Sequence, residues 1–128
     1  MTKELLQLLS PLGVVYWRIA PQNAKYPFFV LTKVSETPNQ DELTATAETE
    51  YLYQLDVYAK TMLEAEAQAE TAVGLLNRPG EVFTLGSYFV AYCRVDSVDD
   101  NTELEITGAE RTVSRITIEF TIKAAKEE

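Results

Sequence analysis

The chain has no histidine and only one cysteine, Cys93, among its 128 residues. The absence of histidine excludes Ser-His-Asp triads, Cys–His dyads and zinc sites that use histidine ligands. One cysteine is too few for an all-cysteine zinc site, and it has no partner for a disulfide within the chain, which favours a reducing compartment such as the cytoplasm. Many enzyme classes are thereby excluded, and we expect no catalytic site, no metal and no cofactor.

Basic residues and long apolar runs are also scarce. The chain has 11 Lys and Arg against 20 Asp and Glu, a formal net charge of −9, which argues against binding to duplex nucleic acid. Its longest apolar runs fall far below the ~20 residues that a transmembrane helix needs. Near the N-terminus, Glu4 and Gln7 interrupt the leucines, and no small-residue cleavage site follows. We therefore expect neither a membrane span nor a signal peptide.

What the chain does contain is enough apolar sequence, 46%, to bury the core of one domain over residues 1–128. The clearest local pattern is an alternating strand followed by a helix. Residues 51–58 alternate between apolar and polar side chains, as in a half-buried strand. Thr61 and Glu64 have the spacing of a capping box, which begins a helix over residues 62–76 with a mainly alanine apolar stripe.

The remaining pattern predicts a short N-terminal helix and several more strands. We expect the helix over residues 2–9 and strands over residues 14–19, 28–35, 82–85, 88–98 and 113–123. Strands in runs with one crossover helix indicate an α+β domain. Its sheet should be mainly antiparallel with about four to six strands, one long helix packed on one face and a short N-terminal helix. We also expect a long polar loop over residues 36–50 and a frayed charged tail over residues 124–128.

An acidic cluster is the first candidate site. Asp96, Asp99 and Asp100 are oxygen donors of the kind that a divalent cation prefers. However, the cluster lacks the glycine and terminal glutamate of a calcium-binding loop, and Asp and Asn are common in turns. We therefore favour a turn at Asp99 and Asp100.

Cys93 is the second candidate. It lies in the expected strand over residues 88–98, on the same side as Phe89, Ala91 and Val95. A nucleophilic cysteine needs a neighbouring base or a lowered pKa, and the chain has no histidine to supply the base. We expect Cys93 to be a small buried hydrophobic residue.

The aromatic residues carry the strongest signal of binding. Seven tyrosines and one tryptophan are a heavy load for a chain of this size. They suit either the core, with hydroxyls at its rim, or a subunit interface, and both interpretations stay open. Together with the polar loop they lead us to predict a partner interface at Asp41, Glu42, Leu43, Tyr51, Tyr53, Tyr88 and Tyr92.

An ordered set of features connects the chain to a known family. After the short helix come Tyr26-Pro27-Phe28-Phe29-Val30-Leu31, a polar loop, Tyr53-Gln54-Leu55-Asp56-Val57-Tyr58-Ala59, and then Thr61-x-x-Glu64-Ala65. In this order, across about residues 1–123, the chain resembles the tail-completion, or tail-terminator, proteins of long-tailed bacteriophages and prophages.

The resemblance implies a binding function with no reaction. Such proteins form a ring, commonly of six copies, that caps the growing tail tube and presents a surface to the head. The implied partners are copies of the chain itself and the tail-tube and head-neck proteins. The implied locations are the host bacterial cytoplasm during assembly and then the virion tail. Two alternatives are another phage neck or minor tail component and a small-molecule-binding α+β domain, in which Lys33, Arg94 or Arg115 contacts an anion.

Overall fold

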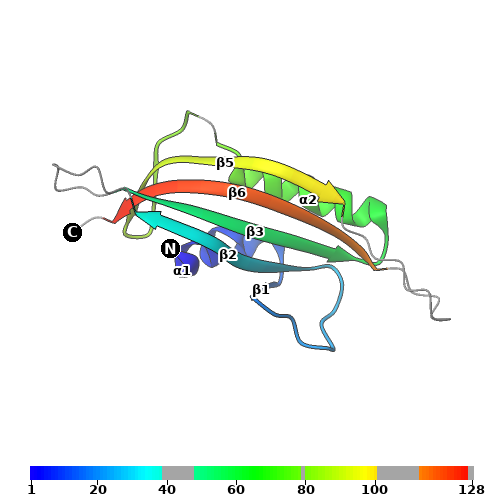
Figure 1. Ribbon diagram of the computed structural model, residues 1–128. Coiled ribbons are helices and arrows are strands. Elements are labelled where there is room, and N and C mark those ends of the chain that lie inside the picture. The colour runs from blue at the N-terminus through cyan, green and yellow to red at the C-terminus, as the bar shows by residue number, and fades with distance from the viewer. Residues whose placement is uncertain (39–47, 79, 101–112, 127–128) are drawn as a thin grey trace.

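The computed structural model describes residues 1–38, 48–78, 80–100 and 113–126. They form a curled six-stranded sheet in the order β1-β2-β3-β6-β5-β4, with both helices on one face (Figure 1). The elements are α1 (Thr2–Leu9), the 3-10 turn η1 (Ser10–Leu12), β1 (Val15–Trp17), β2 (Phe28–Pro38), β3 (Thr49–Ala59), α2 (Met62–Leu76), β4 (Phe83–Leu85), β5 (Tyr88–Asp100) and β6 (Ser114–Lys126). Every strand pair is antiparallel except β1 with β2, so the predicted mainly antiparallel α+β sheet is confirmed.

Both helices span the predicted residues, 2–9 and 62–76. The Thr61 side chain accepts a hydrogen bond from the Glu64 amide at 3.2 Å, as the capping pattern predicts. Ala65, Ala69 and Leu76 are among the buried residues of α2, which confirms the alanine stripe. With 15 residues, however, α2 has an ordinary length and is not the long helix that we expected. No helix in the described part of the chain is long and apolar enough to cross a membrane.

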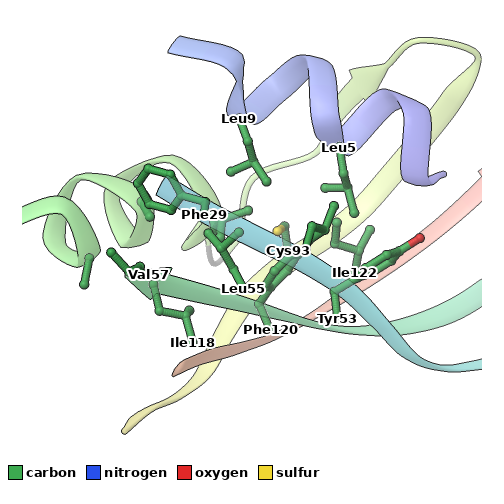
Figure 2. Close-up of a cluster of buried hydrophobic side chains, with 14 of the residues drawn as sticks. Leu5, Leu9, Phe29, Tyr53, Leu55, Val57, Cys93, Ile118, Phe120 and Ile122 are labelled. Atoms are coloured by element: carbon green, nitrogen blue, oxygen red, sulfur yellow. The ribbon is translucent and has the colours of Figure 1, made fainter. Parts of the chain in front are cut away.

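The core lies between the two helices and the sheet. Leu5 and Leu9 point from α1 toward the sheet and belong to one buried cluster with side chains of β2, β3, β5 and β6 (Figure 2). The alternation predicted for β3 and β6 is confirmed, because every second side chain of these strands faces the helices. The buried apolar residues of these strands on that face are Tyr51, Tyr53, Leu55, Val57, Ala59, Ile116, Ile118, Phe120, Ile122 and Ala124.

Four strands, β2, β3, β5 and β6, extend further than the sequence pattern predicts. β2 continues to Pro38 and β3 begins at Thr49, and these two residues pair with each other. The ends of the expected 36–50 loop are therefore strand, and the rest of that loop, residues 39–47, lies outside the described residues. β6 continues through Lys126 because it pairs with β3 and β5 on its two sides, so the frayed-tail prediction is wrong for residues 124–126.

Irregularities in β5 correct two more predictions. The register shifts between Val90 and Tyr92, so Cys93 faces the core while Phe89 lies on the opposite face, 45% exposed. The predicted placement of Phe89 beside Cys93 is thus wrong. Asp99 and Asp100 are paired strand residues, opposite Thr117 and Ile116, and the turn interpretation is wrong for these two aspartates.

Candidate partner-binding surfaces

Two of the predicted interface tyrosines, Tyr53 and Tyr88, bind the start of α1, and the ring of Tyr51 packs against both of them. Tyr53 is fully buried and Tyr51 is 8% exposed. The Tyr53 hydroxyl lies 2.9 Å from the Thr2 hydroxyl, and the Tyr88 hydroxyl accepts a hydrogen bond from the N-terminal ammonium of Met1 at 3.0 Å. Burial raises the pKa of Tyr51 to about 12 and also raises that of Tyr53. A partner would reach the fully buried Tyr53 only if the start of α1 moved aside. The interface role of Tyr51, Tyr53 and Tyr88 stays a prediction.

The other predicted interface residues lie elsewhere. Tyr92 is on the face opposite the helices, which we call the open face, and the Arg94 guanidinium lies 5.2 Å from the centre of its ring. The structure therefore does not bring Tyr92 together with the tyrosines beneath α1. Asp41, Glu42 and Leu43 lie outside the described residues.

A buried carboxylate organises the middle of the open face. Asp56 of β3 is 4% exposed. Its Oδ1 accepts hydrogen bonds from Arg115 Nε at 3.1 Å and from the Thr117 hydroxyl at 2.6 Å, and its Oδ2 accepts one from Gln54 Nε2 at 2.9 Å. Sequence reasoning missed this network, because a polar residue on the polar side of an alternating strand is typical of a solvated surface.

A second carboxylate repeats this arrangement closer to solvent. Asp96 accepts hydrogen bonds from Arg94 Nε at 3.0 Å and from the Thr121 hydroxyl. The two charged side chains are 31% and 54% exposed, against 5% and 30% for Asp56 and Arg115. The acidic cluster that we considered as a cation site is divided by the strand pattern: Asp96 and Asp99 lie on the open face, whereas Asp100 occupies a helix-facing position of the register. No group of three or more His, Cys, Asp or Glu side chains could hold a metal ion within the described ranges.

The three cations considered as anion contacts each have a carboxylate partner. Lys33 binds Glu36 at 3.0 Å, and this hydrogen bond raises the pKa of the Lys33 ammonium. Arg94 and Arg115 bind the two aspartates just described. An incoming anion would have to compete with these internal carboxylates, so the arrangement does not favour the small-molecule alternative.

Aromatic side chains cover the β1 end of the open face. Phe28 and Tyr58 stack with their ring centres 4.9 Å apart, and Tyr16 and Tyr26 pack against Phe28 at 5.8 and 5.3 Å. The segment after β1 lies beside them and leaves a hollow of about 320 Å³ next to Ile19. Ile19 itself is 80% exposed, which is unusual for a large apolar side chain.

An apolar groove with an acidic rim lies on the helix-covered side, between α2 and the end of β5. Its volume is about 330 Å³. The residues that line this acid-rimmed groove are Glu66, Ala69, Glu70, Val73, Val98 and Ile116. Val98 is 50% exposed. Sequence reasoning missed the groove, because it forms only where α2 stops covering the edge of the sheet.

Cys93 has the structural role that we predicted. Its side chain is fully buried, and burial raises the pKa of the thiol to about 12. At neutral pH the group is therefore a protonated thiol within the apolar core, and such a thiol is a poor nucleophile.

The comparison with solved structures gives matches to this fold, whereas the two sequence comparisons do not. No protein-family model matches the sequence, and no curated protein sequence matches it. Among solved structures, the fold is similar to that of a chain described as "Virion of native gene transfer agent (GTA) particle", with a TM-score of 0.58 and 14% sequence identity. The alignment covers 94% of this chain and 84% of the other. At that identity the likeness shows a shared fold.

Proposed function

We propose that this chain is a structural protein of a phage-type tail, which forms a ring that terminates the tail tube and joins it to the head. One observation carries the proposal: the shared fold covers 94% of this chain and most of a chain from a phage-like virion particle. The order of sequence features that resembles the tail-terminator proteins supports the same assignment. On this proposal the chain acts by binding, and it catalyses no reaction.

The distribution of exposed apolar side chains supports an assembly role. Ile19, Phe89 and Val98 are large apolar residues that are 45% or more exposed; Ile19 follows β1, whereas Phe89 and Val98 lie near opposite ends of β5. A ring needs two different adhesive surfaces on each subunit, plus further surfaces for the tube below and the head above. Several separate apolar positions suit that requirement better than one concave pocket would.

Electron microscopy of particles assembled without this protein tests the proposal. A terminator is required to stop tube growth, so its absence should give tails of irregular and excessive length with no heads attached. Finished tails of uniform length without heads would instead indicate the alternative neck role. Complete particles with normal tails would refute a role in tail assembly, provided that the protein is restored in a control that gives the normal particles.

A further inference from the structure

The structure places a basic and apolar segment and an acidic and apolar groove at opposite edges of one sheet. The segment, residues 17–25, begins at the last residue of β1, and β1 is the first strand of the sheet order. The acid-rimmed groove adjoins β5, close to the other end of that order. Figure 1 shows β1 and α2 on different sides of β3. The two surfaces are thus separated within one copy, and each is available to a different neighbour.

We propose that the 17–25 segment of one copy docks into the acid-rimmed groove of a second copy, with Ile19 as its apolar anchor. This inference rests on the ring of the proposed function and names the surfaces that close it. Because the two surfaces differ, the contact is head-to-tail, the kind that generates rings or filaments. A stable interface buries about 800 Å² per partner, so the contact is the anchor of a larger interface.

Charge complementarity identifies the occupant as a second copy. The chain has a net charge of −9, so copies repel each other at most orientations. The segment contains the exposed cations Arg18 and Lys25, two of the chain's 11 basic residues. The groove presents the exposed carboxylates of Glu66 and Glu70 at its rim. When the two surfaces meet, the cations of the segment face the carboxylates of the groove rim. This attraction favours one orientation of docking over the others.

The backbone holds Ile19 outward. The Ile19 amide donates to the Trp17 carbonyl at 2.8 Å, and Arg18 between them has φ 70°. A positive φ with this i to i+2 bond is a rare, strained γ-turn geometry, of the kind that accumulates at functional positions. The Arg18 amide donates to the Leu31 carbonyl at 2.9 Å and ties the turn to β2. Ile19 therefore needs little ordering when it binds, which lowers the entropic cost of the contact.

Three aspartate substitutions at exposed positions test the contact. I19D alters the anchor and V98D alters the groove. L63D on α2 is the matched control, because Leu63 is 80% exposed, as Ile19 is, but does not line the groove. Sedimentation velocity over a concentration series should show self-association about 30-fold or more weaker for I19D and V98D, and unchanged for L63D.

Mixing gives the decisive result. I19D keeps an intact groove and V98D keeps an intact segment, so an equimolar mixture should form a one-to-one dimer that grows no further. If wild type remains monomeric up to about 1 mM, the readout becomes oxidative crosslinking of I19C mixed with V98C, and a crosslinked heterodimer is expected. Cys93 is buried and should not compete.

The proposal is overturned if I19D assembles as well as L63D does, or if neither the mixture nor the crosslink gives a heterodimer. If wild type assembles and I19D and V98D assemble equally well, this contact is wrong, and the ring of the proposed function would have to form through another surface. The opposite result is also distinguishable. If the purified protein pairs head-to-tail but particles assembled without it have normal tails, the proposed function is refuted and this contact stands.

Discussion

Replacing Asp56 by alanine should destabilise the fold far more than the same change at Asp96, although both carboxylates bind one arginine and one threonine. A hydrogen bond to a charged group contributes about 1.5–3 kcal/mol. Asp56→Ala removes the hydrogen-bond acceptor for Arg115, Thr117 and Gln54. Because the Arg115 side chain is 30% exposed, water can replace part of the hydrogen bonding that Arg115 loses. We therefore expect the free energy of unfolding to fall by about 3 kcal/mol.

Asp96→Ala is the matched comparison. Its ion pair is exposed at both ends, and such pairs contribute about 0–1 kcal/mol. Adding part of a neutral hydrogen bond to Thr121 gives an expected loss of about 1 kcal/mol. For a chain of 128 residues the two losses correspond to melting temperatures lower by about 12 °C and about 4 °C.

Urea denaturation followed by far-ultraviolet circular dichroism and by the fluorescence of Trp17, the single tryptophan, measures both losses. The slope of the unfolding free energy against urea should be the same in both variants, since neither changes the surface exposed on unfolding. Equal destabilisation by the two substitutions would refute the argument that burial makes the Asp56 network the stronger one.

Three further predictions concern the core and the helices. The Cys93 pKa is raised from 9.0 to about 12 in the folded state, so the stability that the thiol contributes is complete below pH 9 and falls by about 1.4 kcal/mol per pH unit above it. The fall in unfolding free energy between about pH 8 and pH 10, measured by urea titration, should be smaller for Cys93→Ala than for wild type. An equal fall in both proteins would contradict this. Leu9→Ala should cost about 3 kcal/mol because Leu9 is fully buried, whereas Leu63→Ala, at an 80% exposed position, should cost less than about 0.5 kcal/mol by thermal melting. Thr61→Ala should cost about 1 kcal/mol through loss of the helix cap, while Thr71→Ala, at an exposed position inside α2, should be neutral or slightly stabilising; equal effects in chemical denaturation would rule out the cap as the cause.

Periodic patterns made most of the fold predictable. The alternation in β3 and β6 and the alanine stripe of α2 each depend on residues close in sequence, and the Thr61 cap is equally local. These local rules identified the elements and their buried faces. They could not give strand lengths, because Ala124 is held in β6 by pairing with Val90 and Thr49, both far away in the sequence.

The candidate surfaces were harder to predict for the same physical reason. Asp56 and Thr117 meet across 61 residues, and nothing local distinguishes Asp56 from a solvated strand residue. A single register shift in β5 moves Phe89 away from Cys93, because the side-chain period of a strand is two. The tyrosines show which part of a prediction composition can supply. Their number was correctly noticed, but only the packing of α1 shows which of them are buried.

The central claim is that this chain closes the tail tube at its junction with the head. Gold-labelled antibody against the protein, applied to intact particles and viewed by electron microscopy, tests this most directly. The account predicts label at the head-proximal end of the tail, with a copy number that fits one ring. Label along the tube, label at the distal tip, or no label on particles that a control antibody does mark, would contradict it.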